Sequence, residues 1–130
     1  MVLNDPLANA LSKIFNAEHI GKKTCLVKPL SLLLVKVLTI MKEQGYIGEF
    51  ERIEDGCGGY LKINLLGKIN HCNAIKPRFA VGLLDYERFE KRFLLSKNFG
   101  FLVVSTPQGL MTQTEAIEQH LGGRLLAYCY

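Results

Sequence analysis

The chain has 130 residues, 48% of them hydrophobic, and a formal net charge of +4 at pH 7. This length suits one domain or two very small ones, and this composition excludes wholesale disorder. No apolar stretch reaches the roughly 18 residues that a membrane-spanning helix needs, and the first residues show no signal-peptide pattern. We therefore expect a cytoplasmic protein with no membrane partner.

The first half of the chain predicts two helices and three strands. The first helix begins at Asn4-Asp5-Pro6, which supplies a capping side chain and then a proline, and Gly21 ends it. In chain order we then expect a strand over 24–28, a largely buried helix to residue 44, and strands over 46–53 and 60–65, with a glycine-rich turn between these two strands. This order is αβαββ.

The second half predicts a β-rich unit with two short helices. In chain order we expect an extended segment over 75–79, a helix that Asp85 can cap, a strand over 101–105, a helix that starts with the capping box Thr112–Glu115 and runs to about Leu121, and a strand over 124–130. The whole chain thus predicts a mixed α/β (α+β) fold of two small packed domains, residues 1–68 and 69–130.

Basic and acidic residues occupy separate segments. Residues 13–42 hold six lysines against Glu18 alone, residues 56–84 hold four basic residues and no acid, and residues 43–55 hold five acids. A basic face can attract a polyanion while an acidic face turns elsewhere. Ordinary solvated surface would give the same pattern, so charge alone leaves both interpretations open.

Catalytic and metal-binding patterns are missing from the sequence. The four cysteines form no CxxC pair, and neither they nor the three histidines have the spacing of a structural zinc site. Ser105 lacks the GxSxG elbow of serine hydrolases, and no pair of acids lies in an apolar setting. We therefore expect no enzyme, no cofactor and no metal.

The segment Ser105-Thr106-Pro107-Gln108-Gly109 follows an apolar strand. Hydroxyl groups and a bare glycine backbone suit phosphate, ribose and base edges. The same residues would also serve in a simple connector between a strand and a helix. A second candidate is the stripe of Asn9, Lys13 and Asn16 on the first helix, which could meet phosphates or only water.

A series of motifs resembles one family over essentially all 130 residues. The motifs are Asp5-Pro6-Leu7-Ala8, the segment GYIGEF at 45–50, Pro77-Arg78-Phe79, Phe99-Gly100, Ser105-Thr106-x-x-Gly109-Leu110-Met111, Ala116 and Gly122-Gly123. Their order and spacing are similar to those of small-subunit ribosomal protein eight, in its archaeal and eukaryotic branch.

This resemblance implies a structural protein of the small ribosomal subunit in the cytoplasm. It would bind the central domain of small-subunit rRNA directly, support subunit assembly and translation, and touch neighbouring ribosomal proteins, with no catalytic activity and no small-molecule substrate. Carried onto this chain, the implied RNA-binding residues are Ser105, Thr106, Gln108 and Gly109, then Ser12, Lys13, Asn16, Lys28 and Ser31, with Lys76, Arg78 and Arg124 as further basic contacts.

Residues 98–130 contain Arg124 as their single basic residue, so the 105–109 loop must recognise RNA by fit rather than by charge. Three departures from the family pattern remove or weaken a positive charge: Leu32, Cys57 and His71. Two alternatives stay open, a free-standing RNA-binding regulator on the same fold and a protein-interaction module that uses the acidic segment 43–55.

Overall fold

The computed structural model describes residues 6–28, 32–54, 56, 59–76, 78–94 and 99–130. Sequence predictions at Asn4, Asp5, Ser31 and Cys57 lie outside this part of the chain. The fold consists of two compact units, Met1–Cys72 and Asn73–Tyr130. No helix in the described part has the length and hydrophobicity needed to cross a bilayer.

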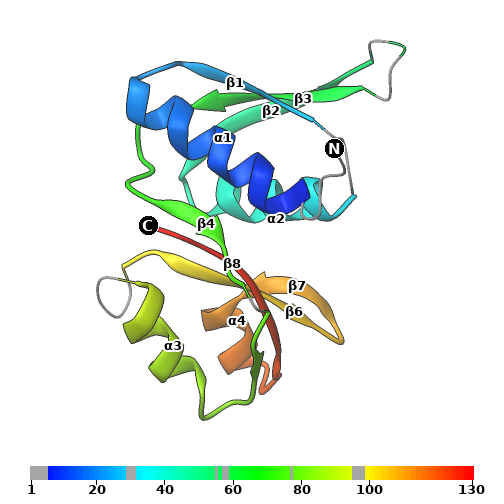
Figure 1. Cartoon of the computed structure of the whole chain (residues 1–130). Coiled ribbons are helices and arrows are strands. Elements are labelled where there is room, and N and C mark those ends of the chain that lie inside the picture. Colours follow the sequence, from blue (N-terminus) through cyan, green and yellow to red (C-terminus); the bar gives the residue numbers. More distant parts are fainter. Residues whose placement is uncertain (1–5, 29–31, 55, 57–58, 77, 95–98) are drawn as a thin grey trace. The chain divides into compact units, whose positions relative to one another are not determined.

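The N-terminal unit confirms the predicted order αβαββ. Its elements are α1 (Pro6–Ile20), β1 (Thr24–Val27), α2 (Leu32–Glu43), β2 (Ile47–Ile53) and β3 (Tyr60–Leu65). The strands form an antiparallel sheet in the order β1-β3-β2, and both helices lie on the same side of it (Figure 1).

The core of this unit follows from the two periodicities of its sequence. Leu7, Leu11 and Ile14 recur at helical spacing on α1 and are buried. On β1 and β3 burial alternates, so that Val27 and Leu61 are paired across the strands and both face the helices.

The segment after β3 is fastened to α1. The Glu18 carboxylate accepts hydrogen bonds from the backbone N–H groups of Gly67 and Ile69, at 3.1 and 2.9 Å. Further along, the Cys72 thiol donates to the carbonyl of Leu11 at 3.6 Å. These bonds keep residues 67–72 with the N-terminal unit, whereas the sequence placed the domain boundary a few residues earlier, after residue 68.

Over its described residues, the C-terminal unit contains five strands and two helices, and the first of these strands begins at Cys72, the last residue of the N-terminal unit. Its elements are β4 (Cys72–Ala74), β5 (Ala80–Val81), α3 (Tyr86–Phe93), β6 (Phe101–Thr106), β7 (Gly109–Thr112), α4 (Gln113–Glu118) and β8 (Gly123–Cys129). The sheet has the order β4-β8-β6-β7, and β5 also pairs with β8. Its core holds Tyr86, Phe89, Leu102, Val104 and Leu125. The predicted mixed fold is thereby confirmed, with one antiparallel sheet in each unit.

The strand β7 corrects one expectation. The sequence allowed a simple connector from strand to helix after Ser105, but the structure forms a β-hairpin in which Thr106 pairs with Gly109 and Val103 with Thr112. The strand is only four residues long, and its last residue, Thr112, also caps α4 by accepting a hydrogen bond from the N–H of Glu115 at 3.3 Å. Because Thr112 both ends β7 and caps α4, the helix-start signal in the sequence conceals the strand.

Two helix ends also differ from the sequence prediction. Asp85 stands at the start of α3 without capping it, because its carboxylate accepts a hydrogen bond from the N–H of Gly82 at 2.9 Å. Helix α4 ends at Glu118 rather than near Leu121, because His120 adopts a left-handed conformation with φ of 57°. The N–H of Leu121 then bonds the carbonyl of Ala116 at 2.9 Å, as in a Schellman motif.

Candidate nucleic-acid interface

The β6–β7 turn is built around the side chain of Thr106. Its hydroxyl donates a hydrogen bond to the carbonyl of Gly109 at 2.7 Å and accepts one from the N–H of Gln108 at 3.2 Å. Thr106 is 8% exposed, whereas Pro107, Gln108 and Gly109 are all exposed. The buried threonine side chain therefore holds the turn together from its inner side, and the three following residues form the solvent-exposed surface of the turn.

The turn needs glycine for its backbone conformation. Proline fixes a negative φ at Pro107, and Gln108 also has a negative φ, so this is not one of the primed turns that suit strand twist unaided. Gly109, with a φ of +120°, supplies the positive φ that Pro107 and Gln108 lack. A Cβ there would meet no atom within 4 Å, so the side of the turn at Gly109 is open.

Ser105 and Arg124 stand beside the turn on one face of the sheet. They are directly paired across β6 and β8, so their side chains point to the same side. Ser105 is half-buried, and its hydroxyl has no hydrogen bond to another residue that the structure describes. Arg124 is exposed. The structure thus gathers five of the predicted residues, Ser105, Thr106, Gln108, Gly109 and Arg124, at one end of the C-terminal sheet.

The Gly122-Gly123 motif explains how β8 can approach its neighbours so closely. A Cβ on Gly123 would collide with the backbone carbonyl of Ser105, and a Cβ on Gly122 would come 2.7 Å from the carbonyl of Val81. Real Cβ atoms do not come that close to a carbonyl oxygen. The two glycines therefore fix the place of Arg124 relative to the hairpin.

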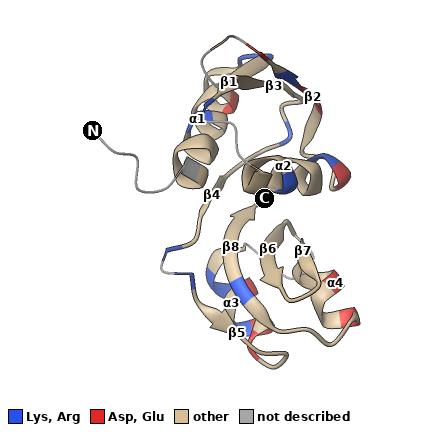
Figure 2. Ribbon diagram, turned by 90° about the vertical axis from the view of Figure 1, so that its right-hand side faces the viewer, with Lys and Arg blue, Asp and Glu red and all other residues tan. Residues whose placement is uncertain are grey.

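Lys76 and Arg78 lie in the exposed segment between β4 and β5, within the same unit. The ribbon in Figure 2 is coloured for Lys and Arg on this segment and on β8, and for Asp and Glu on α4. Arg78 forms no ion pair within the described part of the chain. The basic residues of this unit thus lie away from the acidic helix α4.

A second candidate surface lies in the N-terminal unit, between the end of α1 and β1. Lys13 and Asn16, both predicted, line a hollow of about 500 Å³ with Lys22, Thr24 and Leu26. The sequence did not single out Lys22 and Thr24. They line the hollow because the chain reverses direction after Gly21. In the sequence, the glycine that ends α1 indicated this reversal.

The other predicted residues of this unit lie elsewhere. Ser12 is exposed on α1 but does not line the hollow. Lys28 follows the far end of β1, where its ammonium nitrogen lies 5.6 Å from the ring centre of Tyr60. Ser31 is outside the described residues. Leu32, which stands where a basic residue is usual, is 72% exposed.

Burial keeps the thiols of Cys25 and Cys72 in their neutral form at neutral pH. Burial raises the pKa of Cys25 although Lys13 and Lys22 pull it down, and burial with the nearby Glu18 carboxylate raises the pKa of Cys72 to about 12. Neither thiol therefore supplies a nucleophilic thiolate. Among the described residues, no group of three His, Cys, Asp or Glu side chains is placed to hold a metal ion.

Two comparisons with known proteins identify the family of this chain. The family model described as "Ribosomal protein S8" matches residues 5–130. The chain is also similar to the small ribosomal subunit protein uS8 of Methanococcoides burtonii, with 52% identity over 130 residues and full coverage of both chains. The chain therefore belongs to the ribosomal protein S8 family, as a non-enzymatic, structural component of the small ribosomal subunit.

Proposed function

We propose that this ribosomal protein binds the central domain of small-subunit rRNA directly, through the β6–β7 hairpin, and thereby supports subunit assembly and translation. The observation that carries this proposal is the ordered turn beside Ser105 and Arg124. It presents one hydroxyl, one amide side chain, an open glycine backbone and a single cation on one end of a sheet.

The residues of the hairpin have different roles in this proposal. Ser105 and Gln108 offer polar side chains to ribose or base edges, and Gly109 lets RNA approach the backbone closely. Thr106 acts indirectly, because its hydroxyl already donates one hydrogen bond and accepts another within the turn, and the residue is buried. Arg124 supplies a charge-assisted contact to a phosphate beside the read nucleotides.

This arrangement suits irregular RNA rather than a regular helix. The deep, narrow major groove of A-form RNA keeps side chains from the base edges, whereas bulges and loops display those edges. A turn with one neighbouring cation gains little from non-specific attraction. Its affinity must come from matching shape and hydrogen bonds, which screening by salt affects less than it affects phosphate contacts.

The hollow of the N-terminal unit would supply contacts to the RNA backbone. Lys13 and Lys22 bring two ammonium groups to it, and Asn16 and Thr24 add neutral hydrogen-bonding groups. Lysines act as point charges on phosphates and carry no sequence information. Lys28, Lys76 and Arg78 would add further backbone contacts, as would the hydroxyls of Ser12 and Ser31.

The acidic segment offers less support for a separate protein-interaction role. Two of its carboxylates are already paired within the unit, Glu49 with Lys42 and Glu54 with Arg52, each at 2.8 Å. Contacts with neighbouring ribosomal proteins remain part of the proposal, but the arrangement of polar groups favours RNA as the main ligand.

The test is binding of the purified chain to the transcribed central domain and to a regular RNA duplex of equal length, over a range of salt concentrations. We expect a strong preference for the central domain that persists at high salt. Equal, salt-sensitive binding to both RNAs would contradict specific recognition by the hairpin. Co-sedimentation with small subunits, rather than accumulation in the free fraction, would separate a ribosomal role from that of a free-standing RNA-binding regulator.

A further inference from the structure

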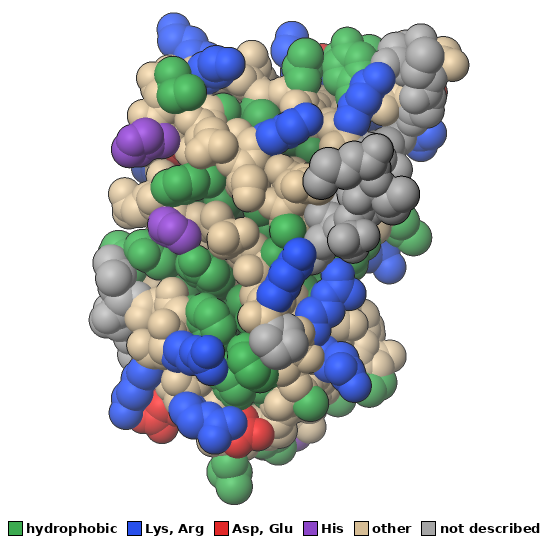
Figure 3. All heavy atoms as spheres, in the orientation of Figure 1, with side chains coloured by type: hydrophobic (Ala, Val, Ile, Leu, Met, Phe, Trp, Pro, Cys, Tyr) green, Lys and Arg blue, Asp and Glu red, His purple; other side chains and the backbone are tan. Residues whose placement is uncertain are grey.

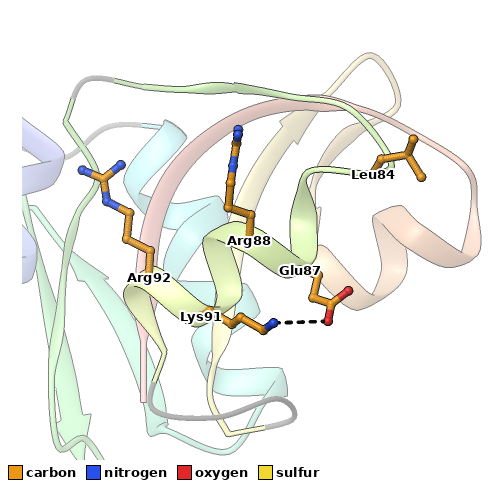
Figure 4. Close-up of a pocket in the computed structure, with 5 residues that line it drawn as sticks. All are labelled: Leu84, Glu87, Arg88, Lys91 and Arg92. Carbon is orange, nitrogen blue, oxygen red and sulfur yellow. Dashed lines mark ion pairs between the residues drawn. The ribbon is translucent and has the colours of Figure 1, made fainter.

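Helix α3 carries two arginines that the predicted RNA-binding set does not include. Arg88 and Arg92 are one turn apart and both are exposed. Figure 4 shows their side chains extending from the same side of α3, whereas Glu87 and Lys91 extend from another side and pair with each other at 3.7 Å. With Leu84, these side chains line a depression of about 550 Å³.

Aromatic rings hold the guanidinium of Arg92. Its central carbon lies 5.0 Å from the ring centre of Phe79 and 5.3 Å from that of Phe93. Because Phe79 precedes β5 and Phe93 belongs to α3, two separate segments restrict the same side chain. A guanidinium over aromatic rings keeps the N–H groups at its edge available for a planar, forked contact.

The charge of Arg92 has no carboxylate counterpart within the described residues. Arg88 also lies over a ring, 4.9 Å from the centre of Phe89, and its contact with Asp85 is long at 3.7 Å. Two like charges at this helical spacing repel each other. An anion bound between or beside them would relieve this repulsion.

The basic surface continues beyond α3. Lys76 and Arg78 lie in the exposed segment that leads directly to Phe79, the ring under Arg92. In the lower part of Figure 3, which shows the C-terminal unit, Lys and Arg side chains lie around exposed hydrophobic side chains. This mixture of cations and half-exposed aromatic rings is typical of surfaces that contact nucleic acid.

We propose that Arg92 and Arg88 bind backbone phosphates of small-subunit rRNA, forming a second RNA contact of the C-terminal unit besides the β6–β7 hairpin. This inference rests on the proposed function. Forked guanidinium groups match the geometry of phosphate oxygens, and the particle to which this protein belongs contains a large excess of phosphate groups. An acidic protein surface is the competing occupant, and the experiment distinguishes the two.

The experiment uses the full chain and the complete transcribed small-subunit rRNA. Arg92→Met keeps an unbranched side chain over both rings and removes the charge, whereas Arg92→Lys keeps the charge and removes the fork. Lys91→Met is the matched control. Lys91 directly precedes Arg92, but its side chain extends from another side of α3 and is paired with Glu87. Arg88→Met provides an independent second variant, and melting curves verify that every variant is folded.

We expect Arg92→Met to bind about tenfold more weakly, with a salt slope reduced by about 1, and Arg92→Lys to lie between it and the wild type. Lys91→Met should bind within about twofold of the wild type. If folded Arg92→Met and Arg88→Met both bind as Lys91→Met does, the α3 contact is wrong while specific binding by the wild type still upholds the proposed function. Loss of wild-type preference for rRNA over duplex would instead overturn the proposed function itself.

Reconstitution with the other small-subunit proteins tests the competing occupant. Normal binding of Arg92→Met to naked rRNA, combined with its loss from reconstituted subunits, would assign α3 to an acidic protein surface and overturn the phosphate assignment. Equal losses in both assays would support phosphate binding.

Discussion

Replacing Thr106 by valine removes one hydroxyl while keeping the branched shape of the side chain. The wild-type hydroxyl makes two hydrogen bonds in the turn, to the carbonyl of Gly109 and from the N–H of Gln108. Each such bond contributes about 0.5–1.5 kcal/mol net. Because Gln108 and Gly109 are exposed, water can replace the lost partner, and the expected loss of stability lies near the lower end, at about 1 kcal/mol.

The effect on RNA binding should arise through the order of the turn. Without the hydroxyl, Gln108 and Gly109 regain conformational freedom that RNA binding must then remove. Both residues stay tethered by the flanking strands, so together they regain about the freedom of one residue, worth about 1–2 kcal/mol. This corresponds to roughly a tenfold loss of affinity for the central domain. Binding to a regular duplex should barely change, because in the proposed function that binding depends on the lysines.

The assays are thermal unfolding followed by circular dichroism and filter binding to both RNAs. We expect Thr106→Val to lower the melting temperature by roughly 4 °C and Thr106→Ser, which retains the hydroxyl, to recover most of the affinity. Thr106→Ser as weak as Thr106→Val would show that the hydroxyl alone does not order the turn. Unchanged stability in Thr106→Val together with a large loss of affinity would refute the internal role and favour a direct bond from Thr106 to RNA.

Three further predictions concern the glycines, the lysines and the buried thiol. Gly123→Ala should lower the free energy of unfolding in urea by about 1–3 kcal/mol, because its Cβ would meet the Ser105 carbonyl. Gly82→Ala is the control and should change little, because its Cβ would make an ordinary contact at 3.6 Å. Equal effects of the two substitutions would show that the close approach of β8 is unimportant. Lys13→Ala should weaken binding to all RNAs alike and flatten the salt dependence, and a loss confined to the central domain would contradict its assignment to phosphates. Folding raises the pKa of Cys72 from 9.0 to about 12, so the folded state favours the neutral thiol. The stability that this thiol contributes should be fully present below pH 9 and should be lost as the pH rises toward 12. Cys72→Ala should reduce this loss, and an identical pH profile would show that the thiol does not cause it.

The order of elements in the N-terminal unit could be predicted because its signals are regular. The apolar spacing of Leu7, Leu11 and Ile14 fits one helix, and the alternation along Tyr60–Leu65 fits one strand. Most elements there are long enough for their period to show, and the short strand β1 is bounded in the sequence by Gly21 and Pro29. Local patterns and tertiary packing therefore agree, and little remains for the structure to correct.

The C-terminal unit was harder to predict because single residues take part in two features. Thr112 ends β7 and caps α4, so the helix signal concealed the strand. Asp85 has the side chain of a helix cap but bonds the N–H of Gly82 instead. His120 ends α4 with a positive φ, which is uncommon for a residue other than glycine. Competing local hydrogen bonds decided these cases, and sequence periodicity does not report them.

The same limit applies to the candidate site. Residue types and spacing, read with the family resemblance, indicated the 105–109 loop and the α1 stripe, but not the hollow that adds Lys22 and Thr24 to Lys13, nor the rings beneath Arg92. Such groupings depend on segments that are distant in sequence or lie across a turn. A sequence reading identifies which groups could bind RNA, whereas the structure shows which of them are already engaged within the protein.

This distinction explains how a nearly uncharged hairpin could bind RNA tightly. The Thr106 hydroxyl fixes the turn by hydrogen bonds, and Gly109 gives the turn its required backbone conformation. Gly123 lets β8 approach β6 closely enough to place Arg124 beside Ser105. Each of these residues removes conformational freedom from the hairpin, which would lower the entropy cost of the proposed RNA binding. Specificity would then come from the rigid placement of a few polar groups, and the lysines of the N-terminal unit with the arginines of α3 would supply affinity without needing comparable precision.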